Sequence, residues 1–225
     1  MDAAFKREIA IGDVHGRLDA LDAMLEEIKP GENDLLIFLG DYVDRGPESA
    51  AVLDRIMKLD SDRGQKDIFL MGNHEDMMLR WLGKIGDRRY SQKWMLVGGR
   101  RVVEEFGGEI PEETIGWLTS RLINRYRTKH ACFVHAGFWE GDDFYEKTPD
   151  FECRWLMDKF LFSGYRYPEL VIVGHSPPDR IPGYNGEGPY LNEQRNIMFL
   201  DCGCYDTGIL AAFDAVKKKV YKVRV

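Results

Sequence analysis

Residues 9–16 read Ile9-Ala10-Ile11-Gly12-Asp13-Val14-His15-Gly16, a short apolar run that leads into a glycine and two polar side chains. An apolar run of this length is too short for an isolated helix and predicts a buried strand. The glycine lets the backbone turn sharply where the strand ends and approach a ligand closely. The stretch therefore predicts a strand that delivers polar side chains to one edge of a sheet.

The same arrangement recurs along the chain. Four further runs are Leu35–Leu39 before Gly40-Asp41, Ile68–Met71 before Gly72-Asn73-His74, Ala131–Val134 before His135-Ala136-Gly137, and Leu170–Val173 before Gly174-His175. In open α/β sheets, the turns at strand C-termini face outward together, and binding sites form there. We therefore expect the polar residues after these runs to share one site.

Helical patterns separate the first three runs. Leu18, Leu21, Leu25 and Ile28 recur at helical spacing, and a second stripe runs through residues 52–59. Residues 77–127 look mostly helical, with one helix over 112–122. A turn-rich loop follows over 176–195, and strands return at 197–200, 209–213 and 220–223. The pattern predicts an α/β fold of two packed mixed β-sheets flanked by helices, as a single domain over residues 1–225.

Composition narrows the function classes. The chain has 225 residues, 44% hydrophobic and 31% charged, with no apolar run near the roughly 20 residues that span a bilayer. Its N-terminus lacks an apolar signal core, and four cysteines fit a reduced cytosolic protein. A net charge of −7 argues against duplex nucleic acid as the main partner. The lysine cluster at 217–219 predicts a protected, solvated edge strand.

Four of the five histidines lie at or just beyond predicted strand ends, and carboxylates and an amide accompany them. Taken alone, each of these polar residues would be interpreted as part of a turn, as a helix cap or as a hydrogen-bonded core residue. Together they form a mixed oxygen and nitrogen set without thiolate, which suits Mn, Fe(II) or Zn and fits Ca poorly. Six ligands are many for one catalytic ion, so the set favours two. The candidates are Asp13, His15, Asp41, Asn73, His135 and His175.

These blocks resemble the calcineurin-like metallophosphoesterase superfamily. Gly12–Gly16 is similar to its GDxHG block, Gly40–Gly46 to GDxxDRG and Gly72–Glu75 to GNHE, while His135 and Gly174-His175 match its later histidines. The GDYVDRG and GNHE versions resemble most the phosphoprotein phosphatase branch, including small phage and bacterial serine/threonine phosphatases. The resemblance covers roughly residues 8–215.

The resemblance implies how the metal ligands divide. Asp13, His15 and Asp41 would hold the first ion, and Asp41 would bridge to a second ion. Asn73, His135 and His175 would complete the second site.

The resemblance also implies roles around the metals. His74 would be the general acid, oriented by Asp44, and Arg45 would bind the substrate phosphate. A second phosphate-binding arginine is expected between His135 and His175. Arg154 is the candidate, Arg166 the alternative, and a purely structural role for Arg154 stays open.

The prediction is a metal-dependent phosphatase, a dinuclear phosphomonoester hydrolase that works by in-line attack of a metal-bridging hydroxide. Resemblance points to a serine/threonine protein phosphatase that uses two divalent ions, Mn first, with Fe or Zn as alternatives. The same motifs occur in symmetrical dinucleoside tetraphosphate hydrolases and small-nucleotide phosphatases. A nuclease and a metal-free interaction module are the remaining alternatives. The expected partner is a phosphorylated protein or a small phosphoester, with no nucleic acid and no membrane.

Tyr184 and Tyr190 predict a loop that borders the cleft and influences substrate choice.

Overall fold

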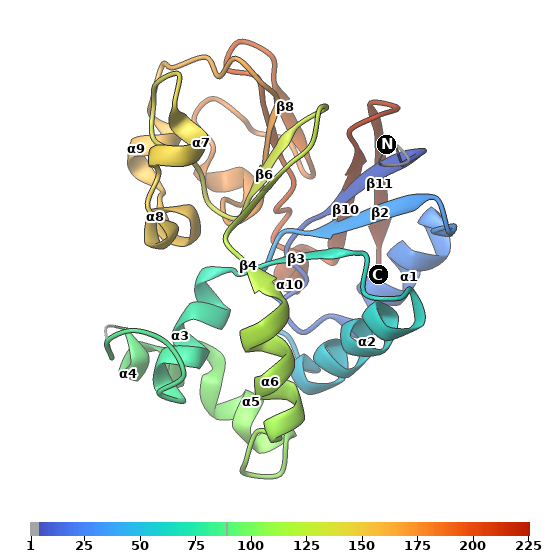
Figure 1. The fold of residues 1–225 in the computed structure, drawn as a ribbon, viewed down its shortest axis with the longest axis vertical. Helices are drawn as coiled ribbons and strands as arrows, with labels where there is room; N and C mark the ends of the chain where they lie inside the picture. Colours follow the sequence, from blue (N-terminus) through green and yellow to red (C-terminus); the bar gives the residue numbers. More distant parts are fainter. Residues whose placement is uncertain (1–4, 89) are drawn as a thin grey trace.

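The computed structural model describes residues 5–88 and 90–225 (Figure 1). Residues 1–4, on which the expected absence of a signal core partly rests, lie outside the described residues. In the described part of the chain, no helix combines the length and apolarity needed to cross a membrane.

The first sheet has six strands in the order β11-β10-β1-β2-β3-β4. They are β1 (Arg7–Ile11), β2 (Asp34–Phe38), β3 (Ile68–Leu70), β4 (Leu122–Ile123), β10 (Ile209–Asp214) and β11 (Lys219–Arg224). Strands β1 to β4 are parallel, whereas β10 and β11 join antiparallel. The lysine-rich C-terminal segment thus forms an edge strand, as predicted.

The second sheet has five strands in the order β5-β6-β7-β9-β8. They are β5 (Arg125–Arg127), β6 (Cys132–Val134), β7 (Val171–Val173), β8 (Tyr190–Asn192) and β9 (Ile197–Phe199). Its three central strands are parallel and both edges are antiparallel. Both sheets are therefore mixed, which confirms the predicted fold class.

The alternation of side chains along β2 explains how the layers form. Leu35 and Ile37 point toward the second sheet, where they share a core with Phe133 and Ile172. Phe38, on the opposite face, packs in the core beneath the helices. A strand covered on both faces must be apolar throughout, which is why the segment reads as an unbroken hydrophobic run.

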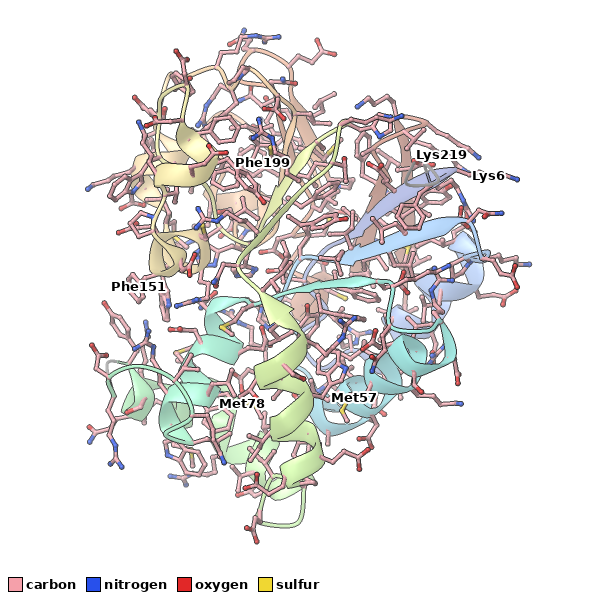
Figure 2. All side chains as sticks on the ribbon, viewed as in Figure 1. Lys6, Met57, Met78, Phe151, Phe199 and Lys219 are labelled. Atoms are coloured by element: carbon pink, nitrogen blue, oxygen red, sulfur yellow. The ribbon has the colours of Figure 1, made fainter. Side chains whose placement is uncertain are left out.

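Helices cover the outer faces of the two sheets (Figure 1). The first sheet carries α1 (Leu18–Ile28), α2 (Ser49–Asp62), α3 (Asn73–Trp81), α4 (Ser91–Trp94), the π-helical turn η1 (Met95–Gly99), α5 (Arg100–Glu105) and α6 (Glu112–Arg121). The second carries α7 (Phe144–Lys147), α8 (Asp150–Trp155) and α9 (Asp158–Leu161). Short turns η2 (Pro178–Arg180) and α10 (Cys204–Thr207) complete the elements. Met78 and Phe199, labelled in Figure 2, lie in the helix-side cores of the first and second sheets respectively.

Two segments differ from the sequence prediction. Residues 122–127, expected to be helical, form β4 and β5, because Leu122 turns to extended geometry at the end of α6 and pairs with Phe69 on β3. Sheet pairing here overrides the local helical pattern. The 176–195 segment, expected to be a loop, contains η2 and the edge strand β8. All four cysteines are buried and free, as expected.

Candidate metal centre

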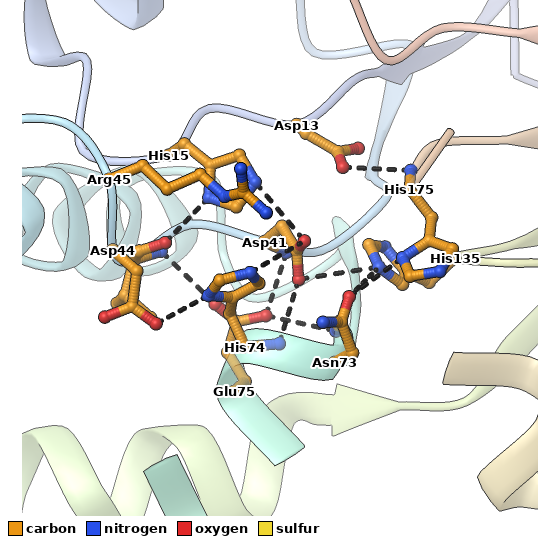
Figure 3. A network of polar contacts seen from close by, with 12 residues as sticks. Asp13, His15, Asp41, Asp44, Arg45, Asn73, His74, Glu75, His135 and His175 are labelled. Carbon is orange, nitrogen blue, oxygen red and sulfur yellow. Dashed lines mark hydrogen bonds and ion pairs between the residues drawn. The ribbon is translucent and has the colours of Figure 1, made fainter. Parts of the chain in front are cut away.

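The polar residues after the predicted strands converge at one edge of the two sheets (Figure 3). Asp13, Asp41 and Asn73 follow the parallel neighbours β1, β2 and β3, and His135 and His175 follow the parallel neighbours β6 and β7. Parallel strands end on the same side, so their C-terminal turns meet there. The structure therefore brings together residues that are up to 162 positions apart, as the contact of His175 with Asp13 shows.

Two glycines make room for the carboxylates. A Cβ on Gly72 would lie 2.1 Å from Asp41 Oδ1, and a Cβ on Gly174 would lie 2.0 Å from Asp13 Oδ1. Both distances are far inside van der Waals contact. Glycine is therefore required at these positions to let each carboxylate lie against the neighbouring backbone.

The loops of the site hold non-glycine residues in the left-handed region. The φ angles are +46° at His15, +53° at Asp41, +70° at Asp44, +68° at Arg45 and +62° at His175. Each such residue costs on the order of 1–3 kcal/mol and persists only where the surrounding structure enforces it. Clustering of this strain at one place is typical of a functional site.

Asp41 lies between two groups of histidines. Its Oδ2 is 3.4 Å from His15 Nε2 and 4.0 Å from His74 Nε2, and its Oδ1 is 3.4 Å from His135 Nε2. Donor atoms of His15, Asp41 and His74 lie within 4.8 Å of one another, as do those of Asp41, His135 and His175. One carboxylate thus belongs to both candidate cation sites.

The ring nitrogens of two histidines are oriented by backbone carbonyls. His15 Nδ1 donates to Val43 O at 2.9 Å, and His135 Nδ1 donates to Leu39 O at 2.8 Å. With the proton on Nδ1, each Nε2 presents its lone pair to Asp41. Anchoring of the distal nitrogen in this way is the usual support for a histidine that binds a metal.

The polar atoms of the cluster are better placed to bind a cation than to form hydrogen bonds with one another. The lone pair of His135 Nε2 faces Asn73 Oδ1 at 3.1 Å and Asp41 Oδ1 at 3.4 Å, so three acceptors converge without a proton. In the described part of the chain, Asp13 Oδ1 and His175 Nε2 are also buried without a hydrogen-bond partner. Bound divalent ions would neutralise this repulsion and occupy these unpartnered atoms.

The pKa values of three histidines of the cluster are lowered, whereas the pKa of His74 is raised. Burial lowers the pKa of His15 and of His175 to about 3, and burial also lowers the pKa of His135, so these rings are neutral and competent as ligands. Burial raises the pKa of Asp13 well above its usual range, and Asp201 and Asp41 add to that rise. Metal cations would reverse it by favouring the charged carboxylate.

His74 is held differently. Its Nδ1 donates to Asp44 Oδ2 at 2.6 Å, and Trp94 Nε1 donates to the same oxygen at 2.9 Å. Burial opposes protonation of His74, but the charges of Asp41 and Asp44 outweigh it and raise the pKa of the ring. His74 is therefore the imidazole of the site best suited to carry a proton.

The predicted arginines occupy different surroundings. Arg45 lines the cleft and donates to the Tyr205 hydroxyl at 2.8 Å. Arg154 is buried and pairs with Asp76 at 3.0 Å. Within the described residues, the lining of the cleft does not include Arg154 or Arg166, and the latter donates to backbone carbonyls of the β8–β9 turn. The phosphate-binding role of Arg154 stays a prediction.

Glu75 is a positioning residue that sequence reasoning did not single out. Its buried carboxylate accepts backbone N–H bonds from Asp41 at 2.8 Å, Tyr42 at 2.8 Å, Val43 at 3.3 Å and Gly72 at 3.0 Å. Burial raises the pKa of Glu75 to about 8, while four convergent donors favour the charged form. Its position at the end of the Gly72–Glu75 block could have identified it from the sequence.

Asp201 was also assigned no role. It follows β9 as the ligand candidates follow their strands, it lines the cleft, and burial raises its pKa to about 7. The same strand-then-carboxylate pattern, Leu200-Asp201, could have identified it.

A cleft of about 830 Å³ opens over the cluster. His15, Asp41, Asn73, His74 and His175 line its base, and the rim includes the loop through Tyr184. Tyr190 stacks on Tyr184, with ring centroids 4.5 Å apart. The tyrosine loop therefore borders the cleft, as predicted.

A family profile, Calcineurin-like phosphoesterase, matches residues 7–202 and so includes every candidate ligand. The chain belongs to the calcineurin-like phosphoesterase family. The family depends on two metal ions, and the two clusters of histidines around Asp41 could hold them.

Relatives divide between two activities. The chain is 30% identical over 150 residues to a symmetrical bis(5'-nucleosyl)-tetraphosphatase of Wigglesworthia glossinidia brevipalpis, covering 64% of this chain and 50% of that protein. It is 28% identical over 214 residues to serine/threonine-protein phosphatase 1 of Salmonella typhimurium, and the match covers 89% of this chain and 88% of that protein. The chain thus spans only about half the length of the tetraphosphatase.

The fold agrees with solved phosphoesterases. A crystal structure of a provisionally assigned diadenosine tetraphosphatase superposes with a TM-score of 0.68 over 99% of this chain and 94% of that one, at 20% identity. At that identity the likeness establishes the fold alone.

Proposed function

We propose that the protein hydrolyses a phosphoanhydride of a symmetrical dinucleoside tetraphosphate. The observation that carries the proposal is the cleft itself, which is lined by Arg45, Lys93, Trp155 and Tyr184 as well as by candidate metal ligands. A polyphosphate needs cations at several points, and nucleosides need apolar faces. The volume of about 830 Å³ lies within the roughly 300–1,000 Å³ of small-molecule sites. Tetraphosphatases among the relatives support the same choice.

We propose the metal ligands that the family resemblance implies. Asp13, His15 and Asp41 would hold one ion, and Asp41 together with Asn73, His135 and His175 would hold the other. Two bound ions would neutralise phosphate charge and activate a water for in-line attack. Mn is the proposed metal, because the donor set mixes oxygen and nitrogen and lacks thiolate.

The remaining roles belong to side chains of the chain itself. Arg45 presents guanidinium donors to a phosphate oxygen. His74 delivers a proton toward the leaving oxygen, and Asp44 holds its ring in place through the Nδ1 hydrogen bond. Because both sheets supply ligands, we treat them as one catalytic unit. The four free cysteines agree with our proposal of a cytosolic location.

A second candidate is a serine/threonine protein phosphatase, which the motifs alone favoured. Its support is the match to the Salmonella phosphatase, which runs over nearly the whole of both chains.

A substrate panel with Mn separates the two. We expect kcat/KM for diadenosine tetraphosphate to exceed that for a phosphoserine peptide by at least about tenfold, which corresponds to about 1.4 kcal/mol of differential transition-state binding. The Asp41→Asn variant serves as the inactive control. A higher kcat/KM on the phosphopeptide would overturn the proposal in favour of the protein phosphatase.

A further inference from the structure

A cluster of three aromatic rings reaches the cleft through Trp155, which lines it. The rings of Trp155 and Tyr90 lie 4.8 Å apart at 27°, and those of Trp155 and Phe151 lie 5.9 Å apart at 17°. Tyr90 and Phe151 are themselves nearly parallel, at 6.2 Å and 13°. Figure 2 shows Phe151 projecting between α8 and α4. We call these three residues the aromatic platform.

Trp155 connects the platform to the cleft. It lines the cleft together with Lys93, whose ammonium nitrogen lies 5.8 Å from the centre of the indole ring. The indole is only partly buried, so a ligand in the cleft can reach it. His74 and Asn73 line the same cleft, so a molecule that binds there through its phosphates has Trp155 on the wall of the cleft that it occupies.

The indole is held rigidly in place. Its Nε1–H donates to Asp76 Oδ2 at 2.9 Å, and Asp76 is completely buried and also pairs with Arg80 and Arg154. A ring fixed by a hydrogen bond and by neighbouring rings loses little conformational entropy when a ligand stacks on it. Such preorganisation is what a stacking site needs, and a ring that merely fills space does not require it.

We propose that Trp155, supported by Tyr90 and Phe151, forms a subsite that stacks one nucleobase of the substrate, with Lys93 contacting the adjoining phosphate. This inference rests on the proposed function, because it assumes a substrate that carries a base. Stacking on an aromatic ring tolerates any base, since every base has a π-face. The subsite therefore selects for dinucleotides as a class and leaves the identity of the base open.

The test compares Trp155→Leu with Trp155→Phe. Both variants lose the hydrogen bond to Asp76, and only the phenylalanine keeps a ring, so their difference isolates stacking. For Trp155→Leu we expect kcat/KM on diadenosine tetraphosphate to fall about 10- to 100-fold, the range for loss of one stacked base. Trp155→Phe should retain most of the activity. Both variants should hydrolyse 4-nitrophenyl phosphate within about twofold of the wild-type rate, a change of under about 0.5 kcal/mol.

Trp139→Leu is the matched control. Trp139 is a partly exposed tryptophan that does not line the cleft within the described residues, so its loss should leave the ratio of the two rates unchanged. A parallel fall of both rates in Trp155→Leu would show a merely structural role and overturn the proposal. An equal fall on a phosphopeptide would assign the platform to peptide binding and overturn it as well.

A binding measurement keeps the two proposals separate. With Mn present, calorimetry should show that the wild type binds ADP more tightly than pyrophosphate by about 10-fold or more, and that Trp155→Leu loses this preference. If the wild type does not turn over diadenosine tetraphosphate, the proposed function fails while this preference still decides the subsite. Absence of the preference in the wild type would overturn the subsite.

Discussion

Glu75 offers the sharpest test of how the metal centre is positioned. Each of its two carboxylate oxygens accepts two backbone N–H bonds, which tie the turn carrying Asp41 to the start of α3. In Glu75→Gln, the amide nitrogen cannot accept a hydrogen bond. Whichever way the amide is oriented, two buried N–H groups therefore face another donor.

The expected loss in the free energy of unfolding follows from these two unpaired N–H groups. A buried donor left without an acceptor costs about 1–3 kcal/mol, so two cost about 2–6 kcal/mol. Whole-protein stability is typically about 5–15 kcal/mol, so the variant should fold but lose a large share of its margin. Because the affected turn carries Asp41, we also expect affinity for Mn to fall about 10- to 100-fold, the usual effect of losing a group that supports a metal ligand.

Urea unfolding and calorimetric titration with Mn measure the two effects. Glu105→Gln is the matched control, because Glu105 accepts a backbone N–H bond from Ala50 at 2.9 Å and is not a candidate metal ligand. It should lose about 1 kcal/mol and keep its Mn affinity. If Glu75→Gln unfolded within about 0.5 kcal/mol of the wild type and bound Mn equally well, the positioning argument would be wrong.

Three further predictions concern the site and the stability of the fold. His74→Asn should lower kcat on a phosphoserine peptide about 10²- to 10⁴-fold, and much less on diadenosine tetraphosphate, because a departing nucleoside diphosphate is a weaker base than an alkoxide and needs less help from an acid. Gly174→Ala should lower Mn affinity by about 10-fold or more in calorimetry, since its Cβ would lie 2.0 Å from Asp13 Oδ1. Asp34→Asn should lower the free energy of unfolding at neutral pH by about 1–3 kcal/mol, because Arg7 Nε donates to that carboxylate at 3.0 Å.

The Asp34 effect has a defined pH dependence. Burial raises the pKa of Asp34, but the Arg7 guanidinium outweighs it and holds the pKa below its usual value. Since the folded-state pKa is the lower one, the stabilisation is complete above about pH 4 and is lost as the pH falls through the folded-state pKa. Urea unfolding of both proteins at a series of pH values checks this, and a constant difference down to strongly acid pH would contradict it.

Specific results would also contradict the predictions for His74→Asn and Gly174→Ala. Full activity of His74→Asn on the phosphopeptide would remove its role as the acid. Unchanged Mn binding by Gly174→Ala would mean that Asp13 can move without cost, and Gly116→Ala, which meets no neighbouring atom within 4 Å, controls for the added methyl group.

The sequence alone determined the architecture and the chemical class of the site. Blocks such as Gly12–Gly16 and Gly72–Glu75 are local, because a strand end, a tight turn and a polar side chain all lie within a few residues of one another. Apolar runs such as Leu35–Leu39 likewise record burial on both faces of a strand. Fold class and ligand types can therefore be predicted without knowing which elements touch.

Only the tertiary structure decided how those parts meet. Sheet pairing made residues 122–127 extended against their local helical pattern. Long-range contacts placed Arg154 against Asp76 and brought Trp155 beside Tyr90 at the cleft. Such contacts join side chains far apart in the chain, and their geometry depends on the packing of whole layers, which no short stretch of sequence encodes.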